Sequence, residues 1–129
     1  MKRIGLFGGS FNPAHRGHRR MSIHAARRLE LDEIWWLVSP GNPLKDPAHM
    51  APLGARFASA RRAARRLPIR VTALERQLGS PYTIDTLRSL RRRFPRARFI
   101  WLMGADNLAQ FDRWRDWRKI AALVPIAVM

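Results

Sequence analysis

The sequence contains no cysteine, and it has only one tyrosine and three lysines among 129 residues. Without cysteine there can be no disulfide bond and no thiolate ligand for a metal ion. No apolar run approaches the roughly 18 residues that a membrane-spanning helix needs, and residues 1–11 carry only a short apolar stretch broken by glycines, too brief for a signal peptide. We therefore expect a cytoplasmic protein that has no membrane partner.

Acidic residues are also scarce: 9 Asp and Glu stand against 25 Lys and Arg, which gives a formal net charge of +16. Such a charge attracts phosphate-rich partners and anionic surfaces at long range. The arginines, however, fall in doublets such as Arg27-Arg28 and Arg61-Arg62, within alanine-rich stretches that predict helices. We interpret them as solvated helix faces and expect no nucleic-acid partner, while a basic nucleic-acid-binding module stays open as an alternative.

A hydrophobic content of 47% is enough for a packed core, and the length suits a single domain over residues 1–129. Short apolar segments predict strands at residues 3–7, 33–39, 68–74, 98–104 and 125–129. Between them, apolar residues recur at helical spacing. The first predicted helix starts near residue 16, and the second covers 53–66. A third begins with Thr83 as its cap, and a fourth carries Trp114, Trp117, Ile120 and Leu123 on one face.

Strands that alternate with helices throughout a chain predict a parallel sheet with helices on both faces, because each right-handed crossover must pack back onto the sheet. Ligands of such α/β folds bind beyond the carboxyl ends of the strands, near the point where the strand order reverses. We expect three segments to converge there: the glycines after the first strand, the loop at 41–45 after the second, and the MGAD stretch at 103–106.

The first of these segments, GGSFNPAHRGH at residues 8–18, carries the clearest chemical signal. Gly8 and Gly9 have no side chains, so a phosphate can approach their backbone N–H groups closely. A helix that starts near Arg16 or Gly17 would point its positive end at the same spot. Together these features predict an anion-binding loop.

Two histidines, His15 and His18, stand three residues apart around the expected helix start. That spacing places both imidazoles on one side of the helix, facing the glycines, where they can donate to phosphate oxygens. A zinc site is the competing interpretation. However, no third ligand of the right kind lies nearby, and zinc-binding histidine pairs on helices usually stand four residues apart. We therefore interpret the loop as a phosphate-binding site without a protein-held metal.

The stretch GGSFNPAHRGH resembles the H-x-G-H signature of the nucleotidyltransferase superfamily, and the chain as a whole is similar to bacterial nicotinate-nucleotide adenylyltransferases. The supporting stretches occur in the family's order: GNPLK at 41–45, SPYTIDTL at 80–87 and GADNLAQFDRWRDW at 104–117. Related pantetheine-phosphate enzymes usually have threonine at the first signature histidine. The resemblance covers nearly the whole chain and implies an α/β, Rossmann-like nucleotidyltransferase fold with a parallel five-stranded sheet.

The resemblance implies transfer of the adenylyl group of ATP to nicotinate mononucleotide, which yields deamido-NAD and pyrophosphate. Catalysis would rest on His15 and His18, with Mg²⁺ arriving on the ATP phosphates and keeping most of its waters. The other implied ATP contacts are Gly8, Gly9, Ser10, Phe11, Lys45, Gly104 and Asp106. Lys45 could equally be a solvated loop lysine, and Asp106 could simply cap the following helix.

The same resemblance assigns three residues to nicotinate mononucleotide. The ring of Trp114 would stack on the pyridine, while backbone N–H groups near Thr83 and Arg115 would receive its carboxylate. Two structural alternatives stay open: Trp114 and Trp117 could both be core residues of one helix, and Thr83 could serve only as the helix cap. Another H-x-G-H transferase, acting on phosphopantetheine or glycerol phosphate, is the alternative within the superfamily.

Two features depart from the family pattern. Asn12 replaces the aspartate that is common before the proline, a change that keeps the turn chemistry. Family members continue beyond the fifth strand to a segment with an ATP-binding arginine, and nothing here matches it, so we expect a fragment, or a truncated and inactive remnant. The sheet face and strand edge left uncovered predict self-association.

Overall fold

The computed structural model describes residues 1–40 and 50–129. Within them the chain forms strands β1 (Arg3–Gly9), β2 (Glu33–Val38), β3 (Ile69–Thr72), β4 (Arg98–Met103) and β5 (Ile126–Val128). The helices are α1 (Arg16–Arg28), α2 (Leu53–Ala63), α3 (Leu74–Leu78), α4 (Thr83–Arg93), α5 (Ala105–Leu108) and α6 (Trp117–Leu123), with a 3₁₀ turn, η2, at Phe111–Arg113. Each strand begins and ends within two residues of the range predicted for it.

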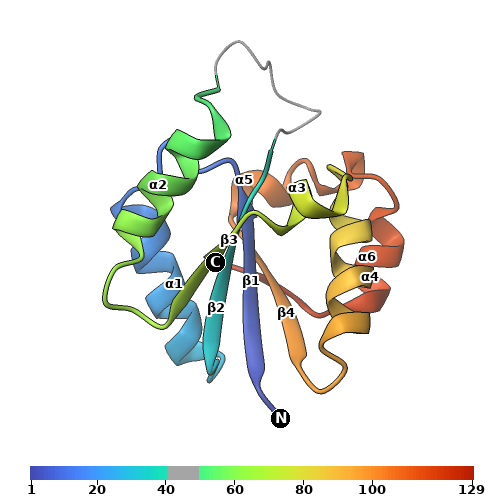
Figure 1. The fold of residues 1–129 in the computed structure, drawn as a ribbon. Coiled ribbons are helices and arrows are strands. Elements are labelled where there is room, and N and C mark those ends of the chain that lie inside the picture. Colours follow the sequence, from blue (N-terminus) through green and yellow to red (C-terminus); the bar gives the residue numbers. More distant parts are fainter. Residues whose placement is uncertain (41–49) are drawn as a thin grey trace.

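The five strands form one parallel sheet in the order β3-β2-β1-β4-β5, as the alternation of strands and helices predicts (Figure 1). From β1 the chain builds outward to β2 and β3, and it then returns to add β4 and β5 on the other side of β1. The strand order therefore reverses between β1 and β4. In α/β sheets this is the place where ligands bind, at the carboxyl edge.

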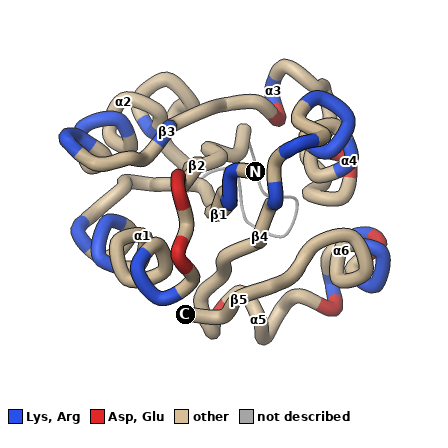
Figure 2. Tube along the Cα trace, turned by 90° about the horizontal axis from the view of Figure 1, so that it is seen from below, with Lys and Arg blue, Asp and Glu red and all other residues tan. Residues whose placement is uncertain are grey.

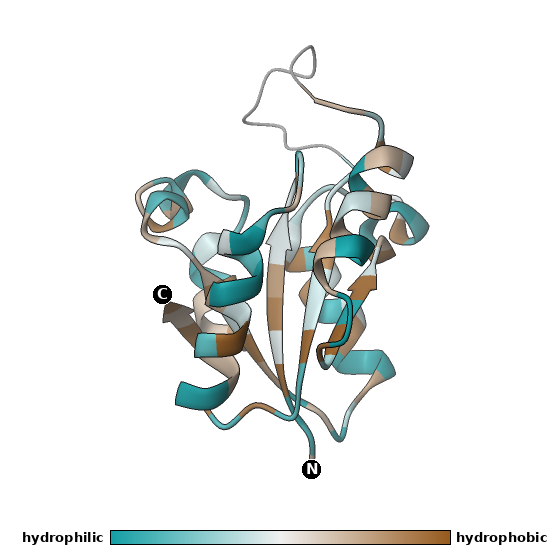
Figure 3. Cartoon of the chain, turned by 90° about the vertical axis from the view of Figure 1, so that its left-hand side faces the viewer, coloured by the Kyte–Doolittle hydropathy of each residue, from teal (hydrophilic) through white to brown (hydrophobic). Residues whose placement is uncertain are grey.

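Helices cover both faces of the sheet, as predicted. Helices α1 and α2 pack on one face, where Ala25 and Ala60 belong to the same buried cluster as Trp36. Helices α3, α4 and α6 pack on the other, where Leu87 and Ile120 join Trp101. The strands between these layers are mostly apolar and the outer helix faces hydrophilic (Figure 3), so burial of the sheet on both sides supplies most of the hydrophobic stabilisation.

Two predicted helix starts are wrong. Thr83 is the first residue of α4 and does not cap it; the N-cap is Tyr82, and no side chain caps that end. Instead, the hydroxyl of Ser80 accepts from the Tyr82 N–H at 3.2 Å and donates to Asp85 in the first turn at 2.7 Å. Trp114 is not on α6, because that helix begins only at Trp117, after Asp116 in the left-handed region (φ 54°). No helix is predicted over Leu74–Leu78, where the structure has α3.

The cations are spread over α1, α2, α4 and α6, around the outside of the fold (Figure 2). Among the described residues one ion pair is found, between Lys2 and Glu33 at 2.9 Å. No helix in the described part of the chain is both long and apolar enough to span a membrane. Strand β5 ends the strand order and Val128 is 44% exposed, but self-association through this edge stays a prediction.

A close contact between two strands explains one of the glycines. A Cβ added to Gly8 in β1 would lie 2.6 Å from Cη2 of Trp101 in β4, a side chain that is only 2% exposed. Such a distance is far below van der Waals contact. The missing side chain of Gly8 is therefore required for packing of the indole ring against β1.

We predict that Gly8→Ala lowers the free energy of unfolding by about 1–3 kcal/mol, because the indole has to move within a packed core. Urea unfolding followed by circular dichroism measures this. Gly54→Ala is the matched control: nothing lies within 4 Å of a Cβ there, so that change in α2 should be neutral or stabilising by up to about 1 kcal/mol. Equal effects of the two substitutions would contradict the packing argument.

Candidate functional site

The carboxyl ends of β1, β2 and β4 lie together at one edge of the sheet, the upper edge in Figure 1. After Gly9 the chain turns to α1 on one face, and after Met103 it turns to α5 and η2 on the other. The two loops diverge because β1 and β4 are neighbours whose connections leave on opposite sides. The sequence pattern predicts the candidate site at this end of the sheet, where the two connections begin.

His15 and His18 form a reciprocal cap at the start of α1. His15 is the N-cap, and its Nδ1 accepts from the Gly17 N–H at 3.0 Å; Nδ1 of His18 accepts from the His15 N–H at 3.0 Å. The two imidazole centroids are 4.0 Å apart. Because both Nδ1 atoms accept, each neutral ring carries its proton on Nε2, which stays available as a donor.

Gly17 explains why a glycine stands between the two histidines. A Cβ at Gly17 would lie 2.8 Å from Cε1 and 2.9 Å from Nδ1 of His15. Any other residue would push the His15 ring off the helix end. The H-x-G-H pattern is thus a helix cap built from imidazoles, in which the glycine leaves room for the first ring and the spacing of three supplies the second.

His18 is half-buried on an aromatic base. Its ring lies 4.8 Å from Phe11 and 5.7 Å from Phe7, measured between centroids. Burial, followed by the charge of His15, lowers the pKa of His18 from 6.5 to about 4. The ring is therefore neutral at pH 7 and presents an Nε2–H donor at the positive end of a 13-residue helix, a place that favours anions.

The four predicted site residues in the loop before the histidines make different contacts. Gly8 accommodates Trp101, whereas a Cβ at Gly9 would meet only the rings of Phe11 and Phe7, at 3.6 Å or more. Phe11 is 1% exposed and in the left-handed region (φ 48°), with its ring stacked on Trp36 at 5.0 Å. Its side chain is therefore part of the core, and only its backbone can face a ligand. Ser10 turns its carbonyl oxygen inward, toward Arg56.

Arg56 in α2 is a residue that the sequence analysis missed. It is 2% exposed, and its guanidinium donates to four carbonyl oxygens: Ser10 at 2.8 Å, Ser39 at 2.6 Å, Pro40 at 3.1 Å and Ala51 at 2.8 Å. One buried cation thus joins the ends of β1 and β2 to the start of α2. Its position on the buried face of the predicted helix, between Leu53 and Ala60, was the available signal.

Glu75 in α3 is a second buried group at this edge. It is 5% exposed, and its Oε2 has no hydrogen bond among the described residues. Burial raises the pKa of Glu75 to about 7, although a hydrogen bond with the Ser39 side chain acts in the opposite direction. Ser39 therefore contacts both buried groups: its backbone carbonyl accepts from Arg56, and its hydroxyl forms the hydrogen bond with Glu75.

The three residues assigned to the pyridine nucleotide lie near one another. Half-buried Trp114 contacts Trp101 and Phe111, with ring centroids at 6.0 Å and 5.3 Å. The guanidinium of Arg115 lies 4.3 Å from the ring centroid of Tyr82, the residue before Thr83. Trp101 touches both Trp114 and the Cβ position of Gly8, so this group and the histidine loop share one aromatic side chain.

The three remaining predicted ATP contacts are Gly104 and Asp106, after β4, and Lys45. Gly104 is the N-cap of α5, and a Cβ there would lie 2.8 Å from Oδ1 of Asp106, whose carboxylate folds back over it. Asp106 is thus in the first turn and is not the cap. Lys45 lies outside the described residues. Within 1–40 and 50–129, no group of three His, Cys, Asp or Glu could hold a metal ion.

A shallow groove of about 710 Å³ runs between α1 and α2, beside the histidine pair. Its walls include His15, Arg16, Arg20 and Arg62. Arg19 also reaches it and donates to the carbonyl oxygens of α2 and the following turn, at 3.3 Å and 3.1 Å. Cations thus flank the start of α1, which strengthens the attraction of this edge for phosphate groups.

A model of the cytidylyltransferase-like family matches residues 6–129. The chain therefore belongs to this family of nucleotidyltransferases. It is 57% identical over 126 residues to a Rhizobium meliloti protein named "Probable nicotinate-nucleotide adenylyltransferase", covering 98% of this chain and 67% of that protein. Within the larger family, it belongs with the nicotinate-nucleotide adenylyltransferases.

A protein of the same name from Erythrobacter litoralis is 65% identical over 127 residues. The aligned region covers 98% of this chain but only 58% of that relative. A Plasmodium falciparum nicotinic acid mononucleotide adenylyltransferase complexed with NaAD matches the fold at a TM-score of 0.80 and 19% identity, over 99% of this chain and 64% of the other. This likeness establishes that the fold is the Rossmann-like one implied by the sequence.

His18 and Glu75 should give opposite pH dependences of stability. The pKa of His18 is lower in the folded chain, so stability is lost as pH falls from 6.5 toward 4. The pKa of Glu75 is raised, so its contribution is present below pH 4.5 and is lost as pH rises toward 7.

In His18→Gln only the Glu75 contribution remains, so we expect the free energy of unfolding to fall from pH 4.5 to 7. In Glu75→Gln only the His18 contribution remains, so we expect it to rise over the same range. Urea unfolding at four pH values measures both slopes. Glutamine is a suitable replacement for His18, because it can still accept from the N-cap N–H. His24→Gln, at an exposed position in α1, should leave the wild-type profile unchanged; slopes of the same sign in the two test variants would refute the assignment.

Removal of the Arg56 guanidinium should cost far more than a surface arginine. We expect Arg56→Met to lower the free energy of unfolding by about 2–4 kcal/mol, since four carbonyl oxygens lose a charged donor. Arg61→Met, at an exposed position in the same helix, should change it by less than about 0.5 kcal/mol. The comparison uses denaturant unfolding, and similar values for the two variants would exclude a structural role for Arg56.

Proposed function

We propose that this chain transfers the adenylyl group of ATP to nicotinate mononucleotide, giving deamido-NAD and pyrophosphate. The observation that carries the proposal is the imidazole cap: two Nε2–H donors, 4.0 Å apart between ring centroids, at the amino end of α1 and beside Gly9. The names of the relatives support the same reaction. We also retain the expectation of a cytoplasmic enzyme.

The reaction needs positioning and charge stabilisation rather than a general base. The phosphate of nicotinate mononucleotide is already ionised, so one of its oxygens can attack the α-phosphorus of ATP directly. As that P–O bond forms, the bond from the α-phosphorus to the bridging oxygen breaks, and pyrophosphate leaves with the electron pair. No covalent intermediate with the protein is required.

In this scheme His18 donates to the α-phosphate and His15 to a neighbouring phosphate oxygen. Rings whose Nδ1 atoms are already engaged in the cap act as preorganised donors, which need no rearrangement as negative charge develops. Backbone groups of Gly8, Gly9, Ser10 and Phe11 would complete the loop. Mg²⁺ enters with ATP as part of the substrate, held by phosphate oxygens and water.

The other half of the site would select the acceptor. Trp114 offers a half-buried ring for stacking on the pyridine, and backbone N–H groups near Thr83 and Arg115 would receive the carboxylate. Arg115 lies over Tyr82 in the described structure, which keeps it next to Thr83. Gly104 and Asp106 would contact the adenosine, with the carboxylate of Asp106 accepting from a ribose hydroxyl.

The test is release of pyrophosphate by the chain supplied with Mg²⁺, ATP and nicotinate mononucleotide. His18→Ala should lower kcat by about 10²–10³-fold, the effect of losing one donor to a transition-state oxyanion. His24→Ala is the matched control, because His24 is an exposed histidine of the same helix, outside the imidazole cap. Its kcat should equal that of the wild type.

Three results would count against the proposal. Release of pyrophosphate only with phosphopantetheine or glycerol phosphate would assign another acceptor. Binding of ATP without turnover, seen as a raised Tm, would indicate a chain that binds the nucleotide but does not react. Steeply salt-dependent binding of single-stranded DNA, unchanged by His18→Ala and without ATP affinity, would favour a nucleic-acid-binding module.

A further inference from the structure

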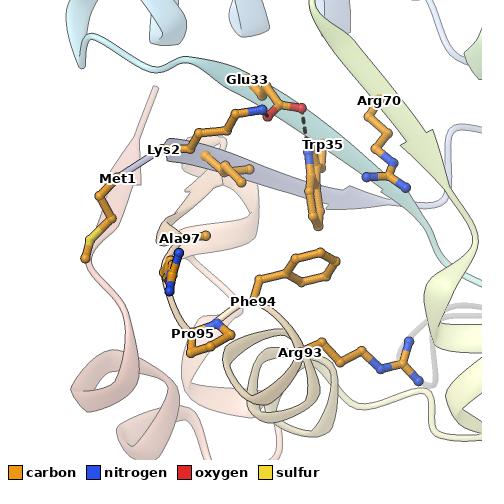
Figure 4. A pocket seen from close by; sticks show the side chains of 11 residues that line it. Met1, Lys2, Glu33, Trp35, Arg70, Arg93, Phe94, Pro95 and Ala97 are labelled. Atoms are coloured by element: carbon orange, nitrogen blue, oxygen red, sulfur yellow. Dashed lines mark hydrogen bonds and ion pairs between the residues drawn. The ribbon is translucent and has the colours of Figure 1, made fainter.

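A second hollow lies at the amino edge of the sheet, opposite the candidate site. It has a volume of about 640 Å³ and is formed by the first residues of β1, β2 and β3 and by the turn from α4 to β4 (Figure 4). The strands separate the two edges by roughly 20 Å, at about 3.3 Å per residue of β1. A ligand here would not occupy the histidine site.

The wall of this hollow is aromatic. Trp35 from β2 and Phe94 from the end of α4 meet edge to face, with centroids 5.2 Å apart, and Phe99 supports both rings from β4. Trp35 is 5% exposed, whereas Phe94 is 39% exposed, one of the four large apolar side chains that the described structure leaves open to solvent. Burial of Phe94 under a flat ring would remove this apolar surface from water.

Cations surround the aromatic wall. The Arg70 guanidinium lies 5.0 Å from the centroid of the Trp35 ring, and Arg93 extends along the same side of the two rings in Figure 4. Arg96 also lines the hollow. Among the described residues, Arg93 and Arg96 have no hydrogen bond or ion pair to a carboxylate.

The single carboxylate in the lining, that of Glu33, is already engaged. It accepts from Lys2 at 2.9 Å and from Nε1 of Trp35 at 3.4 Å. Its charge is therefore matched by Lys2, and the three arginines leave the hollow with an excess of positive charge. An occupant that complements this lining combines a flat apolar ring with a negative group.

We propose that the amino-edge hollow binds an aromatic anion of the size of a nucleoside monophosphate, with its ring against Phe94 and its phosphate paired with arginines of the lining, Arg93 above all. The volume lies within the range of small-molecule pockets, and it exceeds what a ring or a phosphate alone would fill. The proposal is independent of the adenylyl transfer proposed for the carboxyl edge, because none of the lining residues belongs to that site.

The test is titration of the ¹⁵N-labelled chain with AMP, adenosine and inorganic phosphate, followed by NMR of the tryptophan indole N–H groups. Trp35→Phe identifies the signal at the amino edge, and Trp114→Phe identifies one at the carboxyl edge, so the two sites are observed separately. AMP should move the Trp35 signal in a saturable manner, with an affinity at least about tenfold above those of adenosine and phosphate, since only AMP has both the ring and the charge.

Variants distinguish a built site from general attraction to a basic protein. Arg93→Gln and Phe94→Ala should each weaken the AMP response at Trp35 by about fivefold to tenfold, with no change at Trp114. Arg92→Gln is the matched control, because Arg92 is exposed in the same turn of α4 but does not line the hollow. Arg93→Gln alters no packed ring, so it remains informative if Phe94→Ala fails to fold.

Three outcomes would overturn the proposal: a Trp35 signal that does not move with millimolar AMP, equal affinities for AMP and phosphate, or equal effects of Arg92→Gln and Arg93→Gln. The first would show that the hollow is unoccupied, and the others that it only concentrates anions without recognising a ring. Loss of pyrophosphate release in the separate activity assay would not affect any of these measurements, so the two proposals fail independently.

Discussion

The candidate site depends on the exchange of two hydrogen bonds at the start of α1, from the Gly17 N–H to His15 and from the His15 N–H to His18. The first N–H groups of a helix have no partner within it, and here imidazole nitrogens satisfy two of them. This arrangement stabilises the helix end, and it also fixes the tautomer of both rings. The same bonds therefore stabilise the fold and prepare the donors on which the proposed chemistry relies.

The rest of the carboxyl edge keeps this cap in place. Ser22 accepts from Nε1 of Trp36 at 2.8 Å and donates to the carbonyl of His18 at 2.8 Å, which ties α1 to β2. Phe11 packs between Trp36 and His18, and Arg56 holds the loop that contains Ser10. Each of these side chains is buried, so the histidines stand on a rigid base, and a phosphate would meet donors already in position.

The sheet and the helix start at the histidine pair are predicted well from the sequence, because both are encoded locally, whereas the phosphate-binding role of the loop stays a prediction. Each apolar strand segment occupies only a few consecutive residues, and so does the H-x-G-H motif. The sequence was less informative where contacts between distant segments determine the local structure or the role of a residue. Trp114 was assigned to a helix because the pattern has helical spacing, but Asp116 breaks the backbone there. The sequence also does not reveal the packing role of Gly8, which becomes visible only when β4 brings Trp101 beside it, while the phosphate contact expected of its backbone stays a prediction. Three of the four carbonyl oxygens that Arg56 binds, those of Ser10, Ser39 and Pro40, are distant in sequence.

The high positive charge acts on two levels. At long range, a net charge of +16 attracts anions to every face of the molecule and does not select among them. Selection has to come from the few cations and donors whose geometry is fixed, such as the imidazole cap, Arg115 over Tyr82 and Arg70 over Trp35. At the carboxyl edge the imidazole donors are fixed by their hydrogen bonds to the backbone of the helix start, while at the amino edge the donors are long arginine side chains around a rigid aromatic wall. Ordering of such side chains opposes binding, so an anion at the amino edge needs the additional stacking energy of a ring, whereas the helix end can hold a phosphate by itself.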